Sequence, residues 1–127
     1  MSEVKIPQGH NAVMPYLILN NAEGFLAFAQ KVFGAKEIYK KLRDDSPTIM
    51  HAEINISGSA IMFGDCNDQW PPQNAGLFVY VADADATFAA ALEAGAEEIM
   101  PVSNQGYGRS GGVKDPHGNT WWITSVV

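Results

Sequence analysis

Cysteine, basic residues and long apolar runs are scarce in this sequence, and each shortage excludes a class of protein. The one cysteine, Cys66, allows neither an internal disulfide nor a zinc site built from several thiolates. Lys and Arg number 8 against 14 Asp and Glu, so no basic patch is available for nucleic acid. No apolar run approaches the roughly 18–20 residues that span a bilayer, and residues 1–10 lack the pattern of a signal peptide. We therefore expect a cytoplasmic protein that binds neither nucleic acid nor a membrane.

An internal repeat organises the chain. Apolar residues make up 46% of the 127 residues, enough for the core of a single domain over residues 1–127. Residues 34–38 read Gly-Ala-Lys-Glu-Ile, and residues 95–99, about half a chain length later, read Gly-Ala-Glu-Glu-Ile. An apolar strand precedes each match and strand-like runs follow it. We expect two copies of one module, at about 11–65 and 76–127.

The first module has a clear helical pattern among strand-like segments. Phe25, Phe28 and Val32 recur at helical spacing, and Gly34 is a natural end for that helix. Pro15 has no N–H for a ladder, so the strand before the helix should begin irregularly. The predicted strands are 13–20, 37–43, 48–57 and 59–64.

The second module repeats this order. Asp83 or Asp85 should cap a helix that ends at Gly95. Residues 65–75 connect the modules and are too short to separate two domains. The predicted strands are 77–81, 98–102, 107–114 and 120–126.

Several stretches, taken in order and spacing, carry a resemblance to a known family. Together with the repeated module they resemble the vicinal oxygen chelate superfamily, which contains glyoxalase I, bleomycin-resistance proteins, fosfomycin-resistance enzymes and extradiol dioxygenases. The pattern looks most like the glyoxalase-like branch named after a phosphonate-operon protein. The stretches are residues 16–18, 32–35, 50–54, 79–83, 94–96 and 108–120.

This resemblance implies an architecture. It implies an α+β fold of two tandem βαβββ modules, whose curled mixed sheets surround a concave cavity while the helices cover the convex face. It also implies a homodimer, because edge strands in each module need a partner. Whether the modules pair within one chain or between chains stays open at this point.

The metalloenzymes of the family hold their ion on the first and last strands of each module. By resemblance, those four positions fall on Met14, Phe63, Leu77 and Trp122. None of these side chains suits a hard cation, which prefers imidazole and carboxylate ligands. The sequence therefore predicts no metal and no cofactor, and it argues against glyoxalase I, fosfomycin-transferase and extradiol-dioxygenase chemistry.

Strand alternation sorts the side chains of residues 50–56 into two faces. His51 and Glu53 point to the side away from the helices and share one face, together with Asn55. Such a pair could bind a polar group of a ligand or transfer a proton; alternatively, the two side chains simply satisfy each other. The apolar set expected to pack on the helices is Met50, Ala52, Ile54 and Ile56.

Four further residues are candidates for the cavity. Tyr16 could offer its hydroxyl to a ligand, and Phe63 and Trp122 could form an aromatic floor, with Trp121 on the opposite side. Arg109 is the cation to consider for an anionic or carbonyl ligand, although a structural salt bridge is the alternative. His10 and His117 are expected on the surface.

These observations favour a metal-independent protein that binds a small molecule and forms a homodimer. The alternative is a lyase or isomerase that uses His51 and Glu53, with or without a non-standard metal site. A third reading is a protein with a collapsed cavity that associates with a partner. The sequence does not identify the ligand.

Overall fold

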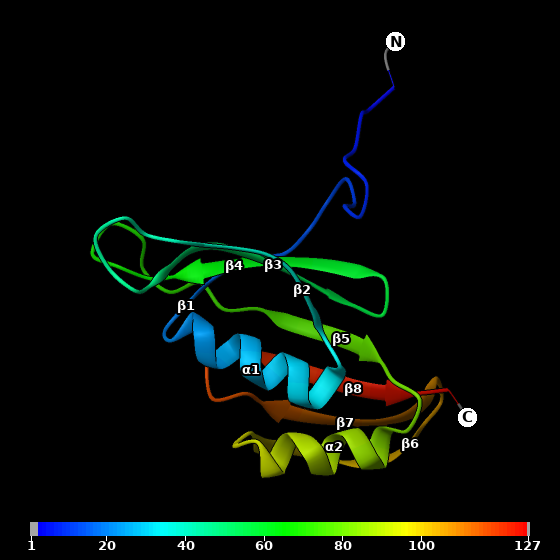
Figure 1. Cartoon of the computed structure of the whole chain (residues 1–127). Coiled ribbons are helices and arrows are strands. Elements are labelled where there is room, and N and C mark those ends of the chain that lie inside the picture. Colours follow the sequence, from blue (N-terminus) through cyan, green and yellow to red (C-terminus); the bar gives the residue numbers. More distant parts are fainter. Residues whose placement is uncertain (1–2, 127) are drawn as a thin grey trace.

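The chain folds into two βαβββ modules, as predicted (Figure 1). The structure, a computed structural model, describes residues 3–126. No helix within that range is long and apolar enough to cross a membrane. The first module comprises β1 (Tyr16–Leu19), α1 (Ala22–Phe33), β2 (Lys36–Leu42), β3 (Ile49–Ile56) and β4 (Ser59–Asp65). The second comprises β5 (Gly76–Tyr80), α2 (Ala84–Glu93), β6 (Glu97–Gln105), β7 (Gly108–Lys114) and β8 (Thr120–Ser125).

Each module forms one mixed four-stranded sheet. The strand order is β1-β4-β3-β2 in the first sheet, here called sheet A, and β5-β8-β7-β6 in the second, sheet B. The first strand of each module pairs in parallel with the last, and the other pairs are antiparallel. The α+β class is confirmed, but neither sheet is strongly curled, unlike the sheets that the resemblance implies.

Local sequence signals set the ends of both helices. The side chain of Asn21 accepts a hydrogen bond from the Gly24 N–H at the start of α1, and Gly34, with φ 65°, ends that helix in the left-handed region. Asp83 caps α2 by accepting from the Ala86 N–H, which decides between the two predicted caps. β1 begins only at Tyr16, later than predicted, because Pro15 has no N–H to donate to a ladder; its carbonyl accepts a hydrogen bond from the Met62 N–H of β4.

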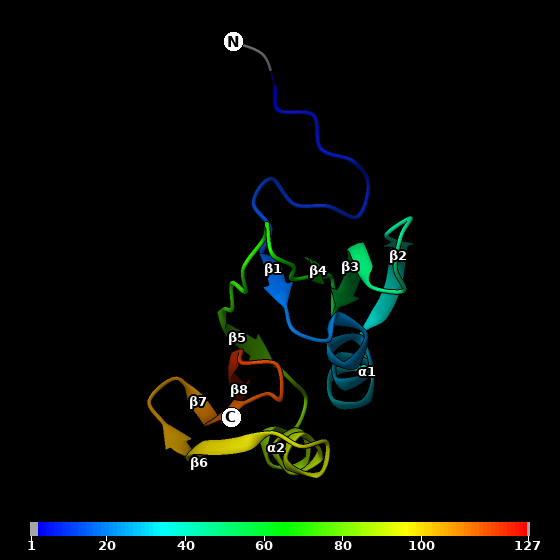
Figure 2. The ribbon, with the colours of Figure 1, turned by 90° about the vertical axis from the view of Figure 1, so that its left-hand side faces the viewer.

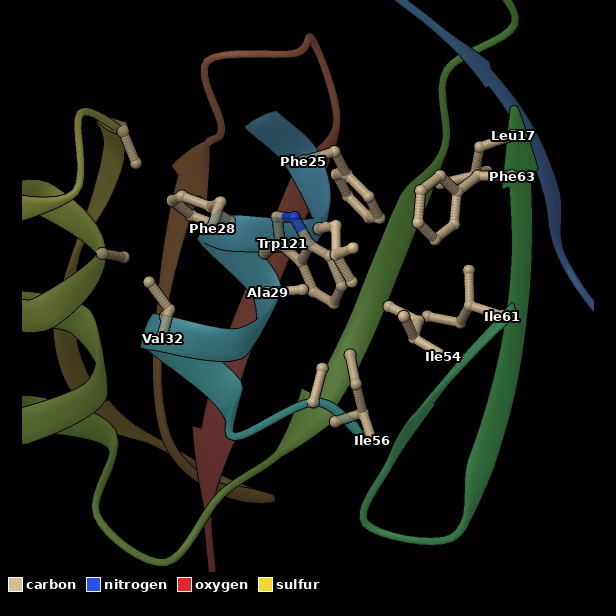
Figure 3. Packing of buried hydrophobic residues seen from close by; sticks show 14 of the residues in the cluster. Leu17, Phe25, Phe28, Ala29, Val32, Ile54, Ile56, Ile61, Phe63 and Trp121 are labelled. Atoms are coloured by element: carbon tan, nitrogen blue, oxygen red, sulfur yellow. The ribbon is translucent and has the colours of Figure 1, made fainter. Parts of the chain in front are cut away.

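Helix α1 joins the two modules. Figure 2 shows it between the sheets and beside α2, while the N-terminal residues 3–9 extend away from both. The ring of Phe25 lies 5.0 Å from that of Phe63 in sheet A and 6.4 Å from that of Trp121 in sheet B (Figure 3). Phe33 adds a second contact to Trp121, at 4.4 Å. One apolar core therefore serves both sheets, and it lies on their helix-facing sides.

The register of β3 contains a shift that the sequence pattern does not reveal. Lys41 pairs with His51, but Leu42 pairs with Ile49, so Met50 is an extra residue in β3. Ile49 takes the inward position and is buried, whereas Met50 is 42% exposed. The expectation that Met50 packs against the helices is therefore wrong, while Ala52, Ile54 and Ile56 are buried as predicted.

The turn between β7 and β8 is held by a buried carboxylate. Asp115, only 3% exposed, accepts hydrogen bonds from the backbone N–H groups of His117 and Asn119. Its other oxygen accepts from Asn119 Nδ2 at 3.0 Å and from Trp121 Nε1 at 2.8 Å. The same carboxylate therefore orders the turn and orients the tryptophan that packs on α1.

Asp115→Ala should lower the free energy of unfolding by about 3 kcal/mol or more, because it leaves the buried N–H groups of Trp121 and Asn119 without an acceptor. Asp68→Ala, which removes an exposed carboxylate, should change it by less than about 0.5 kcal/mol. Urea unfolding of both variants at neutral pH measures the difference. Equal stabilities would contradict the role given to Asp115.

Candidate functional site

The side of sheet A that faces away from α1 carries a set of polar and aromatic side chains. Strand pairing places Tyr16 opposite Met62, Met62 opposite Glu53, and Glu53 opposite Tyr39. Directly paired residues point to the same side of a sheet, so these side chains share one face. We call it the open face of sheet A; His51, two residues before Glu53, belongs to it as predicted.

Four side chains on or beside this face form a continuous hydrogen-bonded row, called here the His–Glu–His–Tyr row. Glu53 accepts from His10 Nε2 at Oε1, at 2.7 Å, and from His51 Nε2 at Oε2, at 2.9 Å. On its other side, His51 Nδ1 lies 3.1 Å from the Tyr16 hydroxyl, and the two rings are stacked with centroids 5.5 Å apart. With the His51 proton on Nε2, Nδ1 is free to accept from Tyr16.

Glu53 is the carboxylate of the row, and both of its hydrogen bonds favour its charged form. The hydrogen bond from His51, followed by that from His10, holds the pKa of this carboxyl below its ordinary value of 4.5. Glu53 is thus the ionised centre of the row, held from both sides. A carboxylate fixed in this way orients the His51 ring, which is the usual function of such a group beside an acid–base histidine.

His10 is the member of the row that sequence reasoning missed, since it was expected on the surface. It lies on the segment before β1, 43 residues from Glu53, and its side chain is partly buried. No local pattern marks this contact, because a turn residue can approach any part of the sheet. Strand parity alone places Tyr16, His51 and Glu53 on one face, but it does not predict the hydrogen bond between Tyr16 and His51.

A cavity of about 800 Å³ opens at one end of the open face of sheet A. The residues that line it include Tyr16 and Ile18 of β1, Met50 of β3, Gly64 of β4 and Trp70 of the connector. The volume is in the range of small-molecule sites. Tyr16 lines the cavity and also ends the His–Glu–His–Tyr row, so the polar row and the cavity share this residue.

Sheet B also has an open face, and it is aromatic. Trp122 pairs with Phe78 and Gly112 there, and the Trp122 ring lies so close to Gly112 that a Cβ at that position would come within 2.4 Å of it. Phe78 contacts Tyr80 and Tyr107, with ring centroids 5.2 and 6.0 Å away. Phe78, Tyr80 and Tyr107 are each at least half exposed. Trp122 and the buried Trp121 therefore face opposite sides, as predicted.

Two candidate residues lie on the helix-facing sides of their sheets and not on the open faces. Phe63 is fully buried and packs edge-on against Phe25 of α1, so it cannot be part of a cavity floor. Arg109 makes a bidentate ion pair with Asp85 of α2, at 2.6 and 3.0 Å, and its third donor reaches Asn104. The geometry therefore supports a structural salt bridge for Arg109 rather than a contact with a ligand. The hydrogen bond from Arg109 lowers the pKa of the Asp85 carboxyl.

The family's metal positions do not fit a divalent cation in this chain. Phe63 and Leu77 face the helix side of their sheets, and Trp122 offers only an indole ring. Met14 offers a soft thioether. Within residues 3–126, no group of three or more His, Cys, Asp and Glu side chains is arranged to hold a metal ion.

The depressed pKa of Glu53 predicts a pH-dependent stability. A carboxyl whose folded pKa lies below its unfolded value stabilises the fold above about pH 4.5 and loses that contribution as the pH falls through the folded pKa. Glu53→Gln should therefore be less stable than the native chain by about 1 kcal/mol at pH 7, with the difference shrinking towards pH 3. Urea unfolding across this range measures it. Glu93→Gln, at an exposed site on α2, should show a small and constant difference; the same flat profile for Glu53→Gln would contradict the prediction.

Comparison with known proteins places this geometry in a family. The chain is 32% identical over 128 residues to an uncharacterized protein of Mycobacterium bovis, Mb0911c, covering 91% of this chain and 84% of the relative. Its fold is similar to that of protein PA1353 from Pseudomonas aeruginosa, with a TM-score of 0.75, 22% identity, and coverage of 90% of this chain and 96% of the other. It is also similar to a PhnB protein from Bacillus cereus, with a TM-score of 0.71, 18% identity, and coverage of 91% and 100%.

The family model of the glyoxalase/bleomycin resistance protein/dioxygenase superfamily matches residues 10–123, which is nearly the whole chain. The match includes the strands and helices of both modules. This chain therefore belongs to the glyoxalase/bleomycin resistance protein/dioxygenase superfamily.

Proposed function

We propose that this protein binds a small organic molecule without a metal ion, in the cavity at the end of sheet A, and that it acts as a homodimer. The observation that carries the proposal is the cavity of about 800 Å³ whose wall includes Tyr16, the terminal residue of a hydrogen-bonded polar row. Members of the superfamily typically bind small molecules. The four family metal positions offer no imidazole or carboxylate, which favours binding through side chains alone.

The cavity combines apolar and aromatic side chains with polar and charged ones, and small-molecule sites commonly pair apolar contacts with oriented polar groups. Trp70, Ile18 and Met50 offer apolar contacts to a flat ligand body. The Tyr16 hydroxyl offers one oriented polar contact, since its partner His51 is held in turn by Glu53. Such a chain of fixed partners lowers the reorganisation needed when a ligand binds.

The His–Glu–His–Tyr row also favours a second candidate function, a lyase or isomerase. Glu53 orients His51, and His51 can accept the Tyr16 proton, so Tyr16 could exchange a proton with a bound molecule. The two functions are distinguished by His51→Gln. Binding should be retained in this variant in either case; if the protein is an enzyme, the native chain converts the bound molecule and His51→Gln loses that turnover.

The open face of sheet B supports the homodimer. Three aromatic residues there, Phe78, Tyr80 and Tyr107, are exposed, and Phe78 contacts the other two. A contiguous exposed aromatic patch is typical of an association surface. The resemblance implies a second copy of this chain as the partner, and covering this face would also bring Trp122 into the interface.

The cavity proposal predicts that filling the cavity blocks binding. Ile18→Trp should weaken the binding of a neutral planar probe, 2-naphthylmethanol, by about tenfold or more, because the added ring occupies part of the cavity that Ile18 lines. Ile38→Trp, an exposed site outside the cavity wall, should leave binding unchanged. Isothermal titration calorimetry measures both. Unchanged affinity in Ile18→Trp would place the site elsewhere.

The association proposal predicts a dimer of twice the 13.7 kDa chain mass in sedimentation equilibrium. Phe78→Lys should raise the dissociation constant of the dimer by about tenfold or more, because the lysine charge would be buried in an aromatic interface. Leu92→Lys, an exposed apolar site on α2, is the matched control and should remain dimeric. A monomer in the native chain, or a dimer unaffected by Phe78→Lys, would contradict this surface.

A further inference from the structure

More negative than positive side chains line the sheet A cavity, and some of these charged groups are already hydrogen-bonded within the fold. Three carboxylates, those of Asp44, Asp45 and Asp65, line the cavity, against one guanidinium, that of Arg43. Asp44 and Asp45 lie in the turn between β2 and β3, and both are exposed. Within residues 3–126 their side chains make no hydrogen bond or ion pair with another residue.

Arg43 and Asp65 are already engaged by the fold. The Arg43 guanidinium donates through Nη1 to Thr48 Oγ1 at 3.0 Å and through Nη2 to the Asp65 carbonyl at 2.8 Å. The Asp65 carboxylate accepts from the N–H groups of Ala22 and Ile49, at 2.8 and 2.7 Å. These two residues hold the start of α1 and the β2–β3 turn against the end of β4. The charges free to meet a ligand are therefore the two carboxylates of Asp44 and Asp45.

The aromatic wall of the cavity favours the same sign of charge. The faces of Trp70 and Tyr16 carry negative electrostatic potential, and tryptophan attracts cations most strongly among the aromatic side chains. Ile18 and Met50 add apolar groups to the lining, which suit a flat hydrocarbon body. A positively charged group could therefore lie near Trp70 and the two aspartates while its apolar body contacts β1 and β3.

We propose that the sheet A cavity selects organic cations that carry an ammonium group on a planar apolar body. This inference rests on the proposed function and adds the class of ligand to it. Asp44 and Asp45 give the selectivity for positive charge, and Trp70 with the apolar wall gives most of the affinity.

Three probes of one shape and different charge test the proposal. They are (2-naphthylmethyl)trimethylammonium, 2-naphthylmethanol and 2-naphthoate, titrated into the full-length protein by calorimetry at low ionic strength. The cation should bind about tenfold more tightly than the neutral alcohol, and the anion should bind most weakly. Raising the salt concentration to about 1 M should remove most of this preference, because the Debye length falls to about 3 Å.

A double variant separates charge selectivity from binding itself. Asp44→Asn with Asp45→Asn should lower cation affinity to that of the alcohol and leave alcohol binding unchanged. Glu97→Gln with Glu98→Gln, which makes the same change in net charge at exposed sites of β6, should keep the preference for the cation. Equal binding of the three probes to the native chain, or a preference that survives the aspartate substitutions, would overturn the cation proposal and leave the cavity proposal standing. If no probe binds, both proposals fail.

Discussion

The packing of α1 against both sheets is the interaction on which the rest of this structure depends. Phe25 contacts Phe63 of sheet A and Trp121 of sheet B, so one helix joins two modules that would each bury too little surface alone (Figure 3). Trp121 is oriented by Asp115, which makes the β7–β8 turn part of the same core. Because each sheet turns its apolar side towards the helices, its other side carries the exposed and polar groups. The candidate sites follow from that division.

The open faces of the two sheets have different chemistry. Sheet A has a carboxylate held between two histidines, and the row ends at a tyrosine hydroxyl beside a cavity. Sheet B has exposed aromatic rings around Trp122. A polar row with a neighbouring cavity suits recognition of a ligand or movement of a proton, whereas an aromatic patch suits association. The proposed division into a binding face and an association face rests on this difference.

Much of the architecture could be predicted from the sequence, because its signals are local. The apolar stripe of α1 with Gly34 at its end, the cap at Asp83, and the opposite orientations of Trp121 and Trp122 depend only on neighbours along the chain. The shared face of His51 and Glu53 follows from strand alternation in the same way. Strand alternation failed for Met50, because Met50 is the extra residue of a bulge and one added residue reverses the parity of a strand.

The sequence by itself determined the two-module organisation, the helices and most strands, and which residues of a strand share a side. The sequence already placed the apolar side of β3 towards the helices, but only the tertiary structure placed Phe63 in the core and Arg109 beside Asp85. The tertiary structure also decided that His10 reaches Glu53, and that residues of β1, the β2–β3 turn, β4 and the connector enclose one cavity. The physical reason is the distance along the chain over which each kind of signal acts. Periodicity and capping act over a few residues, whereas a hydrogen bond between distant side chains requires atoms placed within a few tenths of an ångström, and only the packed core fixes them there.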